Sequence, residues 1–273
     1  MASATQTAPP QSQDGISTAG AAQPQSATFR IWRGADNQGE FVDFNTEVQE
    51  GMVVLDAVHH IQATQATDLA VRWNCKAGKC GSCSAEINGM PKLMCMTRLN
   101  SLDLTRPVTI EPMRTFPHVK DLVTDVGWNY AVKERIQPFQ IKPPEADGTW
   151  REQQADVDRP QEFRKCIECF LCQDVCHVLR DHHMHDQFIG PRFLIHIAQL
   201  EMNPLDQGDR LQELKDSFNI GYCNITKCCT KVCPEGIHIT DNGIIPLKER
   251  VVDRFYDPLA RLKHKLSKKK QPR

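Results

Sequence analysis

The sequence predicts an α+β protein in two parts, a small mixed α/β unit followed by a mainly helical one. Three observations predict this fold class. Strand-like and turn-like segments surround one amphipathic helix in the first part, the second part has helix-compatible composition, and the proline-rich, polar residues 137–160 separate the two. With 273 residues and 40% hydrophobic content, the chain can hold about two domains of the usual size, roughly 100 to 200 residues each.

The ends of the chain and its charge exclude several classes of protein. Residues 1–27 contain no Lys or Arg and are mostly small or polar, so we expect a disordered extension and neither a transit nor a secretory signal. Without such a signal, twelve cysteines indicate a reducing compartment more than a disulfide scaffold. The sequence has no run of about 18 apolar residues, so no membrane span is predicted. The formal net charge of -1 gives no general attraction for nucleic acid.

Short alternating or apolar runs in the first part predict the strands of a mixed sheet: residues 28–33, 41–44, 84–87, 92–94 and 108–110. The turn-like residues 34–39 join the first two runs as an opening hairpin. Asn88-Gly89 is a strong signal for a second hairpin. Apolar residues recur at helical spacing within residues 52–64, which predicts one amphipathic helix lying across the sheet.

Four cysteines of this part have the spacing C-x4-C-x2-C with a distant fourth member: Cys75, Cys80, Cys83 and Cys95. This is the spacing of a plant-type [2Fe-2S] site. Three ligands on one tight loop need backbone freedom, which Gly78 and Gly81 supply. Lys76 and Lys79 place positive charge where reduction adds an electron. A tetrahedral zinc site would use the same thiolates and is the alternative, although zinc ribbons usually pair C-x2-C knuckles.

Three segments of the second part have helix-compatible composition, at residues 192–202, 210–217 and 246–255. Ahead of them, residues 166–176 contain four cysteines with the spacing C-x2-C-x2-C-x3-C. This is the run of bacterial ferredoxins, in which the first three cysteines hold one cluster and the fourth reaches a second cluster. The sequence therefore predicts another cysteine run in the same domain.

The second run lies at residues 223–234, but one of its cysteines is missing. Laid on the same spacing, its four positions are Cys223, Thr226, Cys229 and Cys233. By the crossing rule, a [4Fe-4S] site takes four thiolates: Cys166, Cys169, Cys172 and Cys233. The other site takes Cys176, Cys223 and Cys229. Because Thr226 stands where a fourth thiolate would bind, the fourth iron is easily lost there, which predicts [3Fe-4S].

Cys228 is adjacent to Cys229 and does not fit the spacing. A structural or free thiol is therefore a simpler interpretation than a ligand. Two zinc sites are the alternative for the whole second part. That alternative is weak, because one complete ferredoxin run and a second one broken at a single position rarely occur together by chance.

Together these motifs resemble the iron-sulfur subunit of succinate dehydrogenase and fumarate reductase. The resemblance covers about residues 28–258 and rests on three segments: residues 73–83, 166–176 and 223–234. Residues 164–172 and 222–229 are most similar to an actinobacterial-type branch. The resemblance implies a disordered extension at 1–27, a plant-ferredoxin-like β-grasp domain at 28–136, a linker at 137–160, a helical bacterial-ferredoxin-like dicluster domain at 161–258 and a basic tail at 259–273.

The resemblance also implies a subunit that carries electrons and has no catalytic residue of its own. It would pass electrons from an FAD-bearing catalytic subunit through [2Fe-2S], [4Fe-4S] and [3Fe-4S] to quinone at a membrane-anchor subunit, as part of the succinate:quinone oxidoreductase of the tricarboxylic acid cycle. Its place would be peripheral, at the cytoplasmic face of the cell membrane, and haem b on the anchor is compatible with this role. The chain contains no G-x-G-x-x-G motif of its own for a nucleotide cofactor.

Several alternatives remain open. Within the same chemistry they are the iron-sulfur subunit of a quinol:fumarate reductase and that of a soluble fumarate reductase. From another class, a zinc-stabilised interaction module would need the cysteines without any redox role.

The chain departs from better-known members of the family on the expected quinone side. A proline, tryptophans and a histidine are replaced there by His177, residues 179–181 and Asn224, so His177 and Asn224 are the candidate quinone-side residues. A set of histidines either assists proton transfer to quinone or forms a solvated polar face, which is the simpler interpretation: His177, His182, His183 and His185. The basic residues 261–273 either solubilise the chain end or contact anionic lipid headgroups.

Overall fold

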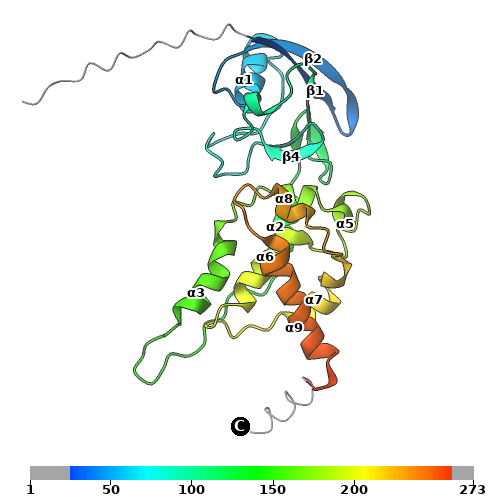
Figure 1. Cartoon of the computed structure of the whole chain (residues 1–273). Helices are drawn as coiled ribbons and strands as arrows, with labels where there is room; N and C mark the ends of the chain where they lie inside the picture. The colour runs from blue at the N-terminus through cyan, green and yellow to red at the C-terminus, as the bar shows by residue number, and fades with distance from the viewer. Residues whose placement is uncertain (1–24, 260–273) are drawn as a thin grey trace, which may run out of the picture.

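The computed structural model describes residues 25–259, in which a strand-rich N-terminal domain packs against a helical C-terminal domain (Figure 1). This arrangement confirms the predicted α+β class with its strand-rich part first. The predicted disordered extension falls mainly on residues 1–24, and the predicted basic tail falls mainly on residues 260–273; both ranges lie outside the described residues. Strand β1 begins at Gln25, slightly before the predicted start of the first domain.

Within residues 25–259 the N-terminal domain contains one sheet of seven strands: β1 (Gln25–Ala35), β2 (Gln38–Val48), β3 (Ser84–Ile87), β4 (Met90–Leu93), β5 (Val108–Glu111), β6 (His118–Lys120) and β7 (Val123–Thr124). The strands lie in the order β4-β3-β5-β1-β6-β7, and β2 also pairs with β1. Because β1 is antiparallel to β2 but parallel to β5, the sheet is mixed, as predicted.

Both predicted hairpins are confirmed, and each has a two-residue turn. In the first, Ala35 pairs with Gln38, and Asp36 and Asn37 between them have φ values of 50° and 64°. In the second, β3 and β4 are joined by Asn88 and Gly89, with φ values of 50° and 73°. Two consecutive residues with positive φ match the right-handed twist of the flanking strands, which is why Asp, Asn and Gly occur at these positions.

Helix α1 (Val54–Thr64) is the predicted amphipathic helix and packs on the sheet (Figure 1). The N–H of Val53 donates to the Asp56 carboxylate at 3.1 Å, which satisfies a free donor at the start of the helix. The helix buries one apolar stripe in the core: Val54, Leu55, Ala57, Val58 and Ile61. Burial of each large aliphatic side chain stabilises the fold by about 1.5–3 kcal/mol.

The remaining helices lie mostly in the C-terminal domain: α2 (Gly127–Glu134), α3 (Gln154–Gln161), α4 (Leu171–Asp174), α5 (His177–Arg180), α6 (Gly190–Glu201), α7 (Leu211–Asp216), α8 (Cys228–Val232) and α9 (Ile245–Phe255). Short 3-10 turns occur at η1 (Leu99–Ser101), η2 (Glu162–Lys165) and η3 (Ile220–Tyr222), and η4 (Ile239–Ile244) is a π-helical turn. The three predicted helices are confirmed as α6, α7 and α9. Helix α3 lies largely inside residues 137–160, where composition indicated a linker.

A buried arginine holds the chain between the two domains in place. Arg210 is fully buried and donates from its Nε to the carbonyl of Gln137 and from its Nη2 to the carbonyl of Pro138, both at 2.7 Å. It also pairs with Asp206 at 2.9 Å. A buried guanidinium is stable only with such a full set of acceptors. Composition predicted a linker from residue 137, and these bonds fix its first residues.

Across residues 25–259 we find no helix with the length and apolar character that a membrane crossing requires.

Candidate iron-sulfur sites

The first group of cysteines lies on the loop between α1 and β3 and just after β4. Cys75 is exposed, whereas Cys83 and Cys95 are buried. The N–H groups of Ala77 and Lys79 point at the Cys75 sulfur at 3.4 and 3.3 Å, and the Cys95 N–H points at the Cys83 sulfur at 3.5 Å. Backbone donors aimed at sulfur stabilise a thiolate.

Cys80 lies among the other thiols of this group. Burial raises the pKa of Cys80, but hydrogen bonds from Ser82 and Cys75 outweigh it and lower the pKa to about 6. Burial raises the pKa of Cys83 to about 12, and the nearby Cys95 and Cys80 add to this rise. These mutual effects show that the fold brings the four cysteines of the first motif together.

The two glycines of the loop are required for different reasons. Both have the positive φ that side chains disfavour, 66° at Gly78 and 68° at Gly81. A Cβ on Gly78 would lie 2.8 Å from the flexible Met96 side chain, which can move. A Cβ on Gly81 would lie 2.6 Å from the Cα of Cys169, which belongs to the other domain. Gly81 therefore permits direct contact between the loop and the second cysteine run.

The lysines of the loop already have partners. Lys79 forms an ion pair with Glu235 of the C-terminal domain at 3.1 Å, and Lys76 lies over the ring of Trp73 at 4.8 Å. Because Lys79 is 70% exposed in its side chain, its ion pair contributes little stability, about 0–1 kcal/mol. The ion pair does place the positive charge of Lys79 at the boundary with the C-terminal domain.

The second group combines both cysteine runs in one cavity of the C-terminal domain, lined by Cys166, Cys169, Cys172 and Cys233. Apolar side chains such as Ile167 and Ile237 form most of the remaining wall. Burial raises the pKa of Cys169 to about 12 and that of Cys172 well above its ordinary value. Four thiols in an apolar wall need compensating charge before they can all be thiolates.

Arg192 of α6 supplies positive charge in this wall. It is buried, lines the cavity, and pairs with Glu168 at 2.6 Å through Nη2. Its Nε is buried and has no hydrogen-bond partner among residues 25–259. A buried donor left without an acceptor is costly. An anionic, thiolate-ligated cluster in the cavity fits this arginine, because it would supply the missing negative charge.

The two cysteine runs follow the same backbone path. The second and fourth residues after the first cysteine have positive φ in both runs: Glu168 (54°) and Phe170 (61°), and Ile225 (62°) and Lys227 (62°). A short helix follows in each case, α4 in the first run and α8 in the second. Left-handed backbone at non-glycine residues is uncommon, so the match is specific. It places Thr226 where the first run has Cys169.

The third group gathers the remaining thiols. Burial raises the pKa of Cys176 to about 11, and the neighbouring Cys228 and Cys223 add to this rise. Cys229 is buried and lies next to Cys172 of the second group, whose negative charge would further raise the pKa of Cys229. The three cysteines predicted for the third site, Cys176, Cys223 and Cys229, therefore lie in one region beside the second cavity.

Cys228 also lies in this region, which its spacing did not indicate. Its sulfur is 3.3 Å from the Thr226 hydroxyl oxygen. As free thiols, Cys229 donates to Cys228, so the pKa of Cys228 falls to about 5 and that of Cys229 rises well above its ordinary value; Thr226 and His177 also donate to Cys228. By the shared path of the two runs, Cys228 occupies the place of the buried Leu171.

The predicted quinone-side residues lie next to the third group. His177 begins α5 directly after Cys176, and its ring lies 6.3 Å from that of His182. Asn224 is exposed beside two exposed apolar side chains, Tyr222 and Ile225. His185 has a different environment, since it packs against Trp128 at 4.8 Å. His177 and His182 are therefore neighbours, whereas His185 packs elsewhere and does not share their surroundings.

Contacts join the three groups in sequence. The first group meets the second where the Gly81 loop lies against Cys169 and the Ser84 hydroxyl donates to the Cys169 carbonyl at 2.9 Å. The second meets the third where helix α4, which contains Cys172, packs against helix α8, which contains Cys229. No set of three or more His, Cys, Asp or Glu side chains within residues 25–259 surrounds a single metal-ion position.

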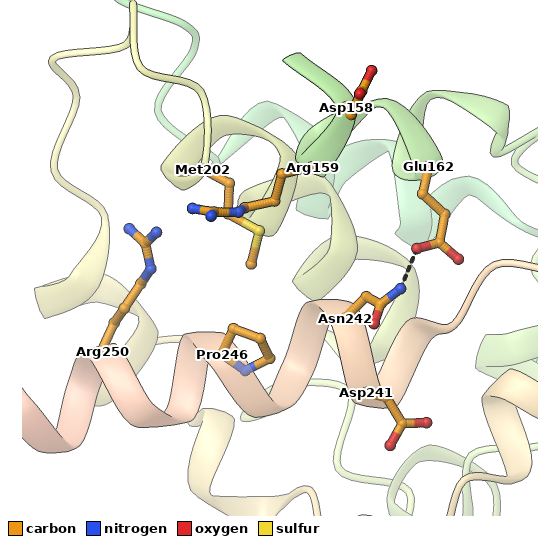
Figure 2. Close-up of a pocket in the computed structure, with 8 residues that line it drawn as sticks. All are labelled: Asp158, Arg159, Glu162, Met202, Asp241, Asn242, Pro246 and Arg250. Atoms are coloured by element: carbon orange, nitrogen blue, oxygen red, sulfur yellow. Dashed lines mark hydrogen bonds between the residues drawn. The ribbon is translucent and has the colours of Figure 1, made fainter. Parts of the chain in front are cut away.

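An open cavity of about 460 Å³ lies elsewhere, between α3, the end of α6 and the start of α9 (Figure 2). Its lining contains no cysteine, and the close-up shows Asn242 bonded to Glu162 on one side and the side chains of Arg159 and Arg250 on the other. With both signs of charge and no thiol, this cavity is not one of the cluster sites.

The fold and these thiol groups define a class of protein, the iron-sulfur proteins that combine a [2Fe-2S] domain with a dicluster domain. The family profile described as a 2Fe-2S iron-sulfur cluster binding domain matches residues 28–129. The profile described as a 4Fe-4S dicluster domain matches residues 162–237.

Named relatives narrow the class. The fumarate reductase iron-sulfur subunit of Mycobacterium tuberculosis is 33% identical over 202 residues, which are 72% of this chain and 80% of the relative. The succinate dehydrogenase iron-sulfur subunit of Paracoccus denitrificans is 31% identical over 246 residues, which are 85% of this chain and 92% of the relative. A chain of the Mycobacterium smegmatis Sdh1 complex in the apo form aligns with a TM-score of 0.83 and 59% identity, over 86% of this chain and 99% of that chain.

This chain belongs to the family of succinate dehydrogenase and fumarate reductase iron-sulfur subunits, and so to an oxidoreductase complex. The resemblance seen in the sequence is thereby confirmed. A zinc-stabilised interaction module is not supported by these relatives.

Proposed function

We propose that this chain carries electrons within a succinate:quinone oxidoreductase, from an FAD-bearing catalytic subunit to quinone at a membrane-anchor subunit. The observation that carries the proposal is the unbroken succession of three thiol groups, each in contact with the next, across the domain boundary. The loop at Gly81 touches Cys169, and helix α4 with Cys172 packs against helix α8 with Cys229. The 59% identity with a chain of an Sdh1 complex supports succinate oxidation.

Each thiol group has an assigned cluster in this proposal. The [2Fe-2S] ligands are Cys75, Cys80, Cys83 and Cys95. The [4Fe-4S] ligands are Cys166, Cys169, Cys172 and Cys233. The [3Fe-4S] ligands are Cys176, Cys223 and Cys229, with Thr226 at the position of the absent fourth thiolate. When bound, such clusters supply one-electron redox chemistry, at potentials set by charge, burial and hydrogen bonds to sulfur.

Residues around the thiol groups stabilise negative charge on the sulfur atoms. The N–H groups of Ala77 and Lys79 donate to the exposed Cys75 sulfur and place their positive ends beside it. Arg192 places a buried positive charge on the wall of the second cavity. The apolar lining of that cavity excludes water, which strengthens every remaining electrostatic interaction. The first thiol group thus has dipolar support from the backbone, and the second has charged support from a buried arginine.

The third group marks the exit. His177 and Asn224 flank it, and the exposed Tyr222 and Ile225 offer apolar surface next to it. We place the membrane anchor and its quinone on this side, with the chain peripheral at the cytoplasmic face of the cell membrane. His177 is the candidate for moving a proton to quinone.

A second candidate is a quinol:fumarate reductase, which would use the same route in the opposite direction. It is favoured by the 33% identity with the fumarate reductase iron-sulfur subunit of Mycobacterium tuberculosis.

Purification of the native complex through a tag on this chain tests both candidates. We expect FAD in a partner subunit and faster succinate-dependent quinone reduction than quinol-dependent fumarate reduction. The reverse order of rates would favour the second candidate, and a complex without FAD would contradict both.

The variant His177→Gln tests the exit side. Quinone reduction is expected to fall about tenfold or more, as is typical when a group that transfers protons is lost, while succinate-dependent reduction of an artificial dye stays unchanged. The variant His183→Gln, at an exposed histidine of the same segment, is the control. Equal loss of quinone and dye activity in His177→Gln would rule out the quinone role.

A further inference from the structure

A buried threonine contacts the sulfur of Cys229. Thr240 is the second residue of the π-helical turn η4 and is 1% exposed. Its hydroxyl oxygen lies 3.5 Å from the Cys229 sulfur and 3.1 Å from the hydroxyl oxygen of Thr230 on α8. The backbone N–H of Thr240 donates to the same Thr230 oxygen at 3.1 Å. π-helical turns often occur at functional sites.

The direction of these hydrogen bonds follows from the proposed role of Cys229. A ligating thiolate carries no proton and can only accept. Thr240 must therefore donate its hydroxyl proton to the Cys229 sulfur. Its oxygen then accepts the hydroxyl proton of Thr230, whose own oxygen accepts from the Thr240 N–H. With Cys229 as a thiolate, both hydroxyl groups and the Thr240 N–H each donate one hydrogen bond in a single direction toward the sulfur.

We propose that the Thr240 hydroxyl raises the reduction potential of the cluster at the third site by donating to the Cys229 sulfur. The inference rests on the proposed assignment of Cys229 as a ligand. Reduction adds negative charge that is shared with the sulfur ligands, so a donated hydrogen bond stabilises the reduced form more than the oxidised form. Because Thr240 is buried, water does not replace its hydroxyl, and the interaction is not weakened by solvent.

A higher potential at the third site would be useful there. An electron that has passed the first two groups would be held at the end nearest quinone, so the last site would be filled before quinone is reduced. Thr240 would be a positioning and tuning residue, since it acts on the cluster through Cys229.

A structural role would give a different result, and matched variants separate the two. Thr240→Val keeps the size and the β-branched shape but removes the hydroxyl, whereas Thr240→Ser keeps the hydroxyl. Both retain the backbone N–H that joins η4 to α8. The control is Thr46→Val, because the buried hydroxyl of Thr46 has no hydrogen-bond partner within the described part of the chain.

The experiment is a redox titration of the purified complex, followed by EPR of the third cluster. We expect Thr240→Val to shift the equilibrium toward the oxidised cluster about tenfold, which is about 59 mV downward for one electron. Thr240→Ser and Thr46→Val should keep the wild-type potential. An unchanged or raised potential in Thr240→Val, with its EPR signal intact, would overturn the inference.

Two further variants cover the remaining outcomes. If Thr240→Val fails to retain the cluster, the variant Thr230→Val tests the inference instead. It removes the donor to the Thr240 oxygen and should lower the reduction potential by a smaller amount. An unchanged potential in Thr230→Val would overturn the inference. Cys229→Ser should abolish the signal of the third cluster. If the signal persists, the ligand assignment and this inference fail together, whereas its loss combined with an unchanged Thr240→Val potential refutes the inference alone.

Discussion

Single residues decide which thiol belongs to which group. Cys172 and Cys176 are four positions apart, yet Cys172 shares a cavity with Cys166 and Cys169, whereas Cys176 lies with Cys223 and Cys228. The short helix α4 between them turns the chain from one group to the other. This is the crossing that the run of bacterial ferredoxins predicts.

The crossing is tested by two serine variants. Cys172→Ser should damage the [4Fe-4S] signal and Cys176→Ser the [3Fe-4S] signal, because a neutral hydroxyl is a poor replacement for a thiolate ligand. EPR of the oxidised and reduced complex measures both. Cys228→Ser is the control and should retain all three signals, since Thr226 already occupies the position of the fourth ligand. Loss of the opposite signals in the first two variants would refute the crossing.

The loop of the first cysteine motif contacts the second cysteine run at Gly81, where no side chain would fit. The first loop lies on the second cysteine run because Gly81 has no Cβ, which would come within 2.6 Å of the Cys169 Cα. Backbone atoms cannot move aside as the end of a side chain can. The contact between the two elements therefore depends on one missing methyl group.

Gly81→Ala should separate the loop from the run and slow electron transfer from [2Fe-2S] to the next cluster, by about tenfold or more. Freeze-quench EPR after addition of succinate measures this step. Gly89→Ala is a matched control, because Gly89 has a similar φ of 73° but no heavy atom within 4 Å of the added Cβ. Both variants carry about 1–2 kcal/mol of left-handed backbone strain. An equal effect in the two would show that strain, and not the contact, is responsible.

Helix α6 contains a histidine whose protonation opposes folding. Burial lowers the pKa of His196 to about 4; the positive charges of Arg192, Lys133 and Arg210 lower it further, and Glu168 opposes them. In an unfolded chain the pKa of histidine is about 6.5. The stabilising contribution is therefore complete above about pH 6.5 and is lost as the pH falls toward 4, because only the unfolded state binds the proton in that range.

His196→Gln should remove this pH dependence. Between pH 7 and pH 5, the wild type should lose on the order of 2 kcal/mol of unfolding free energy through this residue, a loss that the variant avoids. Urea unfolding at the two pH values measures the difference. A variant with the wild-type dependence on pH would show that His196 takes up its proton in the folded protein.

At the scale of the whole molecule, a buried ion pair joins the two domains. Arg180 of α5 donates to the fully buried Glu86 of β3 at 2.9 Å, and Arg114 lies 3.4 Å from the same carboxylate. Arg180 stands in the segment where better-known family members have tryptophans. The structure places it at the domain boundary, so this part of the expected quinone side has a structural role.

Arg180→Met should destabilise the docked domains by about 3 kcal/mol, because it leaves a buried carboxylate with a single, more distant partner. Thermal unfolding and limited proteolysis of the complex measure the loss. Glu86→Gln in the same chain should restore much of it. The control is Arg30→Met, whose pair with Asp43 is exposed on both sides and therefore contributes little to stability. If the two arginine variants lost equal stability, the interdomain pair would have no special role.

The features that were predictable from the sequence are those set by residues close together in the chain. The hairpin turns at Asn37 and Asn88 and the apolar stripe of α1 follow from neighbouring residues, and so they were predictable. Strands β6 and β7 are too short for a pattern, and they depend on contacts such as that of His118 with the Asp121 carbonyl. The spacing of the cysteines predicted which thiols to group, and those ligand sets stay predictions.

The surroundings of the thiols were not predictable, for a physical reason. The buried Arg192 and Thr240 belong to no spacing rule, and they reach the cysteines only through tertiary packing. The spacing of Cys228 predicts a structural or free thiol, and it gives no sign that Cys228 lies near Cys176. Residues that tune a site lie far along the chain from the residues that form it, so a local pattern does not reveal them.

The shared cavity also has a consequence during synthesis of the chain, because its four thiols are made at different times. Three of its thiols, ending with Cys172, are synthesised about 60 residues before Cys233. At the usual speed of translation, the fourth thiol arrives roughly 3 to 12 s later. Until then the cavity lacks one wall, and any iron delivered to the nascent chain would find an incomplete set of ligands. Under the proposed ligand set, delivery to this cavity waits until Cys233 has been synthesised, whereas the four cysteines of the first group are complete at Cys95.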